Sequence, residues 1–350
     1  MSETATIQFY EVEECGYFKR GEDEADFGSL SDTLYQLEDW ASQEELRLVD
    51  TQTYTPGDSG NLYPAYCFNI IHSQGRNDYL LTTWNRVPST DEQIASAREN
   101  SQVGEVDVEL TDLPENSIPG YATYFWFIPE DDRFATIQFD RPKNGHPQLK
   151  RYLTEFLAKF TSYVVEEETQ GDELEIEGYR EHPEDEPEHY YPRFTSVPSR
   201  TEGQIDLIRE RRPHIRKIIR KNRLGDDLVG DVPLTWKQTI LRELGLNDPA
   251  NTEEDEGLKT KYEVSYEPNE GELDDIIENW EENHDEGSRW HDVGFRFKGQ
   301  SSKTYWLSNS LIKQERDLDV DRINEEVVGA NSLLQEILDQ RQSLLAPIPG

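Results

Sequence analysis

Cysteine is scarce in this chain, and long apolar runs are missing. Cys15 and Cys67 are the only cysteines among 350 residues, too few for the disulfide framework of a small secreted protein. No stretch approaches the roughly 18 apolar residues that a membrane-spanning helix requires. Residues 1–14 carry neither the basic nor the apolar region of a signal peptide. These absences predict a protein of the reducing cytoplasm.

Motifs of well-known enzymes are missing too. The sequence has no Walker loop, no dinucleotide-binding glycine fingerprint and no Gly-x-Ser-x-Gly nucleophile motif. A metal-dependent nuclease needs carboxylates and a lysine on adjacent strands, and only Asp292 and Lys298 suggest such a pair. We therefore predict no catalytic residue, no metal site and no cofactor. A non-enzymatic function is favoured, and a nuclease site assembled from distant residues stays open.

Positive charge is low: 35 Lys and Arg stand against 73 Asp and Glu, which gives a net charge of −38. Halophilic adaptation would spread acidic residues everywhere, and a DNA mimic would array them along a regular face. A solvated surface with one functional basic patch would instead show a local reversal of charge. The segment RERRPHIRKIIRKNR (209–223) contains eight of the 35 basic residues, and only Glu210 opposes them. This concentration favours the third interpretation.

Aromatic residues make up 11% of the chain and include seven Trp, which argues against wholesale disorder. Segment 120–141 predicts a hairpin of aromatic-rich strands, and the helical spacing of apolar residues in 146–165 predicts an amphipathic helix packed on it. We predict an α+β fold with two domains, each a mainly antiparallel sheet with packed helices. The predicted boundaries are 1–165 for the N-terminal domain, 166–192 for an acidic linker or insert, and 193–350 for the C-terminal domain.

The last part of the chain predicts a strand at 259–268, a helix at 269–282 and a long helix from residue 317 onward. Apolar residues of that final helix alternate spacings of three and four, and Arg341 stands where the next apolar residue belongs. The pattern leaves three interpretations open: a core helix, antiparallel packing, or the seam of a homodimer.

The basic segment contains a proline that suits a helix start. Pro213 is well placed as the first residue of a helix, so we predict a basic helix in the C-terminal domain. Ile215, Ile218 and Ile219 would form its apolar stripe and anchor it on a core, while the basic side chains would face outward and hold phosphates. The predicted nucleic-acid-binding residues are Arg209, Arg211, Arg212, Arg216, Lys217, Arg220, Lys221 and Arg223.

Such a basic face has three candidate partners. It can pair with the acidic loops of its own chain, bind the phosphates of nucleic acid, or lie on an anionic membrane. The three isoleucines lack the Trp, Phe or Leu of a membrane-bound helix, which disfavours the membrane. No aromatic residue interleaves the basic ones, so base stacking on single strands is disfavoured as well. We predict contact with the backbone of double-stranded DNA, with little sequence preference.

Several segments resemble RexA-type phage-exclusion proteins. YFWFIPEDDRFATIQFDRP and LKRYLTEFLAKF match the strand, acidic turn, strand and helix of the family's first half. SRTEGQIDLIRERRPHIRKIIRKN is similar to a later segment, and KYEVSYEPNEGELDDIIENW with DVGFRFKGQSSKTYWLS resembles a closing strand–helix–hairpin unit before a final helix. The resemblance covers about half the chain and rests on element order, without a short diagnostic motif. The chain departs from the family by being far more acidic and by longer inserts.

The resemblance implies an intracellular protein that binds DNA, self-associates and acts with a membrane-channel partner to abort phage infection. The leading hypothesis is therefore a non-enzymatic, largely sequence-independent DNA-binding sensor component of an antiphage defence or exclusion system. The alternative is an acidic interaction protein or DNA mimic that binds a basic protein partner. The third hypothesis is the metal-dependent nuclease.

Overall fold

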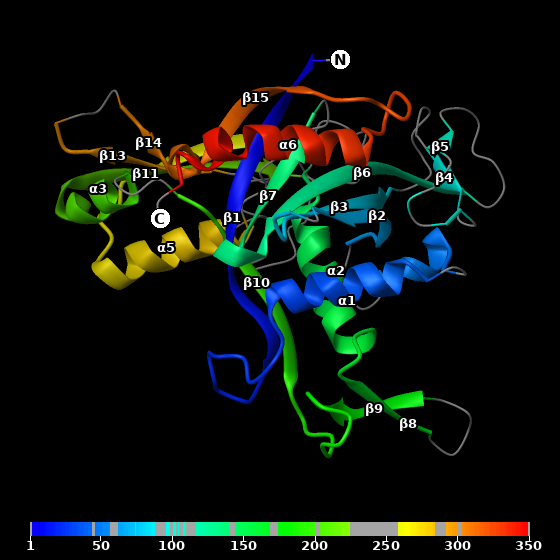
Figure 1. Cartoon of the computed structure of the whole chain (residues 1–350). Helices are drawn as coiled ribbons and strands as arrows, with labels where there is room; N and C mark the ends of the chain where they lie inside the picture. Colours follow the sequence, from blue (N-terminus) through cyan, green and yellow to red (C-terminus); the bar gives the residue numbers. More distant parts are fainter. Residues whose placement is uncertain are drawn as a thin grey trace. The chain divides into compact units, whose positions relative to one another are not determined.

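The chain folds as two units in this computed structural model. Unit 1 comprises Met1–Arg200 and Ile312–Gly350, and unit 2 comprises Thr201–Leu311. Antiparallel sheets with packed helices confirm the predicted α+β class (Figure 1). The structure describes residues 2–43, 46–56, 62–73, 75–87, 96–98, 101–102, 104, 108–109, 117–139, 144–168, 174–200, 204–224, 258–283, 292–299 and 303–348.

Unit 1 is built on an antiparallel sheet whose strands lie in the order β10, β1, β7, β6, β3, β2. Their bounds are β1 (Ser2–Phe18), β2 (Ala65–His72), β3 (Tyr79–Arg86), β6 (Ser117–Ile128), β7 (Arg133–Gln138) and β10 (Tyr191–Pro198). Shorter strands off this path are β4 (Ser96–Arg98), β5 (Val108–Glu109) and β15 (Lys313–Asp319), the last paired with β1. The β6–β7 pairing confirms the predicted aromatic hairpin, and Asp132 closes its turn in the left-handed region, at φ 47°.

Helices cover both faces of this sheet. Their bounds are α1 (Leu30–Ala41), α2 (His146–Lys159) and α6 (Ala330–Leu345). One face buries Tyr10 and Phe134 under α1 and α2, and the other buries Phe9 and Trp126 under α6. The predicted amphipathic helix is confirmed as α2, because its apolar side chains belong to the first of these cores. Unit 1 is therefore a sheet between two helical layers (Figure 1).

The long terminal helix is shorter than predicted. Residues 317–329 lie in the end of β15 and in a loop, and α6 begins only at Ala330. Val320 and Val327, which the spacing assigned to the helix, are buried in that loop. Pairing of β15 with β1 holds this part of the chain extended, because ladder hydrogen bonds to a distant strand outweigh a local helical spacing. The apolar side of α6 is buried in the core of its own chain.

Unit 2 contains a sheet in the order β12, β11, β13, β14, with helices packed on it. The bounds are α3 (Gln204–Glu210), β11 (Ile215–Leu224), β12 (Leu258–Val264), α5 (Glu270–Asn283), β13 (Asp292–Phe297) and β14 (Tyr305–Trp306). The strand, helix and hairpin expected from 259 onward are thus present as β12, α5 and β13–β14. Ile208, Phe295 and Ile277 lie at the centre of the core between the sheet and the helices.

The predicted basic helix is wrong, because most of the segment is a strand. Pro213 lies in a single 3₁₀ turn, Arg212–His214, and β11 follows it. A bulge between Ile215 and Lys217 adds one residue to β11, so Ile215 and Ile218 both pack in the core. Because of the bulge, the two core residues Ile215 and Ile218 are three positions apart in the sequence instead of two. A spacing of three is typical of a helix, which explains the wrong prediction. Isoleucine favours the pleated sheet, and β11 is paired on both sides.

The division into units also differs from the predicted boundaries. The acidic segment 166–192 belongs to unit 1, where β8 (Val164–Glu168) pairs with β9 (Leu174–Tyr179). The chain leaves unit 1 only after Arg200 and returns to it at Ile312. Unit 2 is therefore an insertion between two parts of unit 1, and the terminal helix belongs to unit 1.

Hydrogen bonds join the two ends of unit 1 where unit 2 is inserted. Ser199 N donates to Phe9 O at 2.8 Å, and Ile312 N donates to Ser199 O at 2.9 Å. We expect a variant that joins residues 1–200 to 312–350 through a short Gly-Ser linker to fold, because these hydrogen bonds need nothing from unit 2. Its thermal unfolding, followed by circular dichroism, should remain a single cooperative transition. A gradual loss of signal without a transition would contradict the division.

Candidate nucleic-acid interface

The two sides of β11 carry different side chains. Ile218 packs in the core with α5, and neighbouring residues of a strand point to opposite faces of the sheet. Lys217 and Lys221 therefore lie on the face away from that core, with Ile219 buried between them. The register places partners from β12, β13 and β14 on the same face. We call this surface the basic sheet face; it consists of Lys217, Lys221, Lys261, Glu263, Arg296 and Trp306.

Glu263 organises one half of the basic sheet face. Its carboxylate accepts hydrogen bonds from Lys217 Nζ at 3.0 Å and from Arg296 Nη1 at 2.8 Å. The bond from Lys217 lowers the pKa of Glu263, and the charge of Arg296 adds to the effect. All three side chains are 23–34% exposed, so water screens the pairs and they add little stability. The carboxylate orders two cations and leaves the face with an excess of positive charge.

Trp306 occupies the other half. Lys221 Nζ lies 3.8 Å from the centroid of the indole ring, and Lys261 Nζ lies 5.8 Å from it. Gly294 pairs with Trp306 in the register, and a Cβ at this glycine would come within 2.7 Å of the indole Cε3. The glycine therefore lets the ring lie directly against β13. Segment 209–223 contains no aromatic residue. In the folded chain, however, Trp306 from β14 lies beside Lys221 and Lys261.

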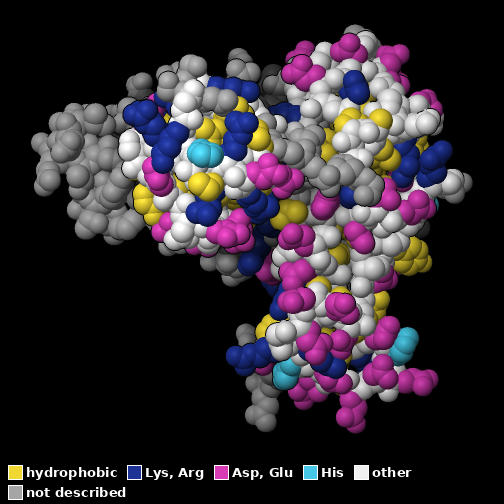
Figure 2. Space-filling view, turned by 90° about the vertical axis from the view of Figure 1, so that its left-hand side faces the viewer, with side chains coloured by type: hydrophobic (Ala, Val, Ile, Leu, Met, Phe, Trp, Pro, Cys, Tyr) yellow, Lys and Arg dark blue, Asp and Glu magenta, His cyan; other side chains and the backbone are white. Residues whose placement is uncertain are grey.

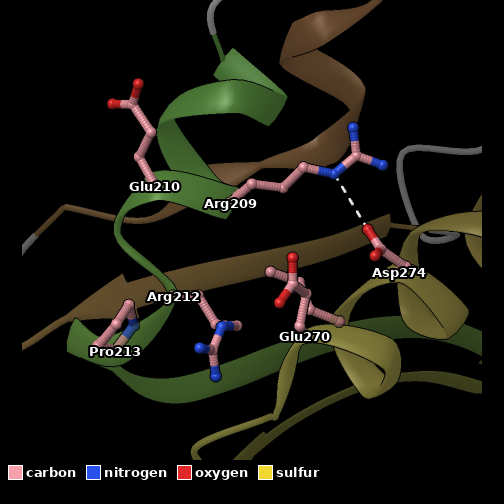
Figure 3. A pocket seen from close by; sticks show the side chains of 7 residues that line it. Arg209, Glu210, Arg212, Pro213, Glu270 and Asp274 are labelled. Atoms are coloured by element: carbon pink, nitrogen blue, oxygen red, sulfur yellow. Dashed lines mark hydrogen bonds and ion pairs between the residues drawn. The ribbon is translucent and has the colours of Figure 1, made fainter.

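Arg209 and Arg212 belong to a different site. They line a hollow of about 220 Å³ between α3, the 3₁₀ turn and α5, together with Glu270 and Asp274 (Figure 3). Arg209 Nε donates to Asp274 Oδ1 at 3.0 Å, and Arg212 Nη1 donates to Pro268 O at 3.3 Å. The view shows Glu210 pointing away from the other side chains. The carboxylates of Glu270 and Asp274 in this hollow offset the positive charge of the two arginines.

The remaining predicted residues are spread over unit 2. Arg211 lies with its guanidinium 5.9 Å from the ring of Phe297. Arg216 is exposed and Arg220 is half-buried, and neither forms an ion pair with another residue that the structure describes. Arg223 lies in β11, but its side chain is outside the described part of the chain. Of the eight residues, the structure thus brings Lys217 and Lys221 together on one face.

Sequence reasoning missed Lys261, Arg296 and Trp306. Lys261 stands in a strand-like alternation at 259–268, and Arg296 and Trp306 stand in the predicted hairpin. The shared face arises from the pairing of β12 and β13 with β11 and of β14 with β13, and a helix at the basic segment predicts no such pairing. Figure 2 shows one side of the molecule, where Lys and Arg side chains lie beside hydrophobic ones and beside Asp and Glu side chains.

Asp292 and Lys298, considered for a nuclease, are engaged in separate interactions. The carboxylate of Asp292 is buried and accepts hydrogen bonds from Ser308 Oγ at 2.6 Å and Ser308 N at 3.2 Å. Burial raises the pKa of Asp292 above its ordinary value. Lys298 forms an ion pair with Glu267 at 2.5 Å. Within the described ranges, no group of three or more His, Cys, Asp and Glu is arranged to hold a metal ion.

A comparison of the chain with protein-family models, curated proteins and solved structures finds no match. The similarity to RexA-type proteins therefore stays a prediction that rests on the quoted segments. Of the helices that the structure describes, none is both long and apolar enough to cross a membrane.

Proposed function

We propose that unit 2 binds nucleic acid through the basic sheet face, by interactions with the sugar-phosphate backbone and with little sequence preference. The observation that carries this proposal is the local reversal of charge. Lys217, Lys221, Lys261 and Arg296 lie on one face of the sheet with two carboxylates, Glu263 and the buried Asp292, in a chain whose net charge is −38. Carboxylates are the commonest charged groups of this protein, yet here they are the minority.

The acidic background is compatible with such binding. Charges more than about 8 Å apart are largely screened at physiological salt, so a phosphate on the face responds mainly to its nearest lysines. Distant carboxylates slow the approach of a polyanion and penalise every other orientation of it. The basic sheet face is then the favoured docking point for a backbone.

We propose the wider role that the resemblance implies: a non-enzymatic, cytoplasmic sensor in an antiphage defence or exclusion system, acting with a membrane-channel partner. The support is the position of the similar segments. KYEVSYEPNEGELDDIIENW covers most of β12 and α5, and DVGFRFKGQSSKTYWLS covers β13 and β14. SRTEGQIDLIRERRPHIRKIIRKN covers most of β11, so the segments that resemble the family contribute to all four strands that build the basic sheet face.

Alanine substitution of Lys217, Lys221, Lys261 and Arg296 together tests the interface. Duplex DNA affinity, measured by fluorescence anisotropy between 50 and 200 mM salt, should fall roughly tenfold or more at the lower salt. The log–log salt slope should shrink by about 0.9 for each phosphate that the variant no longer neutralises, because fewer counterions are released. Sequence changes in the duplex should have little effect on affinity.

The matched control changes the same amount of charge elsewhere. Its sites are the exposed basic residues Arg20, Arg76, Arg86 and Lys313 of unit 1. If both quadruple variants lose the same affinity, net charge rather than the basic sheet face governs binding. If the wild-type protein binds no DNA at 50 mM salt, the proposal fails and an acidic interaction protein or DNA mimic takes its place.

A further inference from the structure

We infer that the basic sheet face takes single-stranded nucleic acid in preference to duplex, with one base stacked on Trp306. This inference rests on the proposed function and names the class of its ligand. The observation behind it is a three-layer arrangement, in which the sheet, the indole and an ammonium group lie one above the other. The flanking cations would hold the phosphates on either side of the stacked base.

The first layer is the backbone of β13. A Cβ on Gly294 would come within 2.6 Å of Thr304 Cγ2 and 2.7 Å of Trp306 Cε3. The indole therefore packs directly on the backbone at Gly294, and the sheet fixes the orientation of the ring. A ring fixed in this way is already oriented for stacking and loses little conformational freedom when a ligand binds.

The layer above the indole is the ammonium of Lys221, 3.8 Å from the centroid of the ring. Lys261 lies further out, at 5.8 Å. Cation–π interactions at half-exposed sites are weaker than the stacking of a base on an aromatic ring. A base can thus replace the ammonium of Lys221, whose flexible stem lets the charge move to a phosphate instead.

The remaining cations lie close enough to the indole to hold the phosphates of a nucleic-acid strand whose base stacks on it. Gly294, under the indole, and Arg296 are two residues apart on β13, which is about 7 Å along a strand. Arg296 and Lys217 are register partners and share Glu263. One side of the stacked base therefore faces this pair, and the other faces Lys261.

A duplex fits this arrangement less well. Its bases are stacked on one another inside the helix and cannot reach a ring that lies flat on a sheet. Single strands expose the faces of their bases, and every base has a face that can stack, so sequence preference stays low. The geometry of Trp306 thus favours single strands, whereas the lysines alone would not discriminate.

The test compares Trp306→Ala with Trp306→Phe. Affinity is measured by anisotropy at 50 mM salt, with a labelled single-stranded oligothymidylate and a duplex of the same length. We expect Trp306→Ala to weaken single-strand binding about 5- to 100-fold and to change duplex binding less than about twofold. Trp306→Phe keeps a ring and should retain most of the single-strand affinity. Thermal unfolding of each variant shows whether the fold is intact.

The possible results distinguish base stacking on Trp306 from the proposed backbone binding by the basic sheet face. Equal losses for single strand and duplex with Trp306→Ala would overturn the stacking role and leave backbone binding in place. Unchanged single-strand affinity would overturn it as well. Should the wild-type protein bind neither probe, the proposed function fails and the inference fails with it. Lys221→Ala adds a further check: the salt slope of single-strand binding should shrink by about 0.7 while the single-strand preference persists.

Discussion

Replacing Asp78 with alanine should lower the free energy of unfolding by about 3–5 kcal/mol. The side chain of Asp78 is only 2% exposed, and it accepts hydrogen bonds from Arg341 Nε at 2.8 Å and Trp126 Nε1 at 3.0 Å. The alanine variant leaves the guanidinium of Arg341, whose side chain is 16% exposed, without its carboxylate, and the indole N–H of Trp126 without an acceptor. Both groups would then be desolvated without compensation.

The measurement is urea unfolding of the variant at neutral pH, with Asp50→Ala as the matched control. Arg47 and Asp50 form a slightly shorter ion pair, at 2.6 Å, but their side chains are 51% and 38% exposed. The control should cost at most about 1 kcal/mol, because water replaces the missing partner. Asp78→Ala combined with Arg341→Ala should recover part of the stability, since no buried charge is then left unpaired. Equal costs for Asp78→Ala and Asp50→Ala would mean that Arg341 finds another partner.

Arg341 also shows where the sequence could not be interpreted correctly. In the apolar pattern of the final helix, Arg341 stands where the next apolar residue belongs. In the structure it reaches Asp78, which lies 263 positions away in the sequence. A charged residue on the apolar side of a helix is compatible with the core only if a buried partner exists. The sequence alone does not place that partner.

Local patterns, by contrast, were reliable in unit 1. The aromatic hairpin and the helix α2 could be predicted because the residues that form each element lie close in the sequence and their spacing has one meaning. The apolar residues of α2 recur at helical spacing and are buried as expected. The α+β class followed from such elements. The insertion of unit 2 did not, because it depends on the pairing of β15 with Ser2–Gln8 at the opposite end of the chain.

The candidate site was predicted only in part. Charge composition indicated the right segment, 209–223, but the bulge after Ile215 gave a strand the spacing of a helix. The predicted surface therefore contained residues that the strand sends to opposite faces. Lys217 and Lys221 remained together, whereas Arg209 lies beside Asp274. The sequence did not indicate Trp306 as part of the site, because β14 does not pair with β11 and is joined to it only through β13.

Replacing Ile337 with alanine should destabilise the protein by about 2–5 kcal/mol. Ile337 is fully buried among the side chains of α6 and the sheet of unit 1, and truncating it leaves a cavity there. Gln335→Ala, on the exposed side of the same helix, should change stability by no more than about 0.5 kcal/mol. Urea unfolding of both variants measures the difference.

The same pair of variants bears on the homodimer expected from the sequence. If α6 packs only in its own chain, the unfolding midpoints of the wild type and of Ile337→Ala do not depend on protein concentration. A dimer seam would make the wild-type midpoint rise with concentration, because association stabilises the folded state by mass action. Ile337→Ala would then abolish that dependence. We expect no dependence, since Ala330, Leu334 and Ile337 of α6 already pack in the core that contains Phe9 and Trp126.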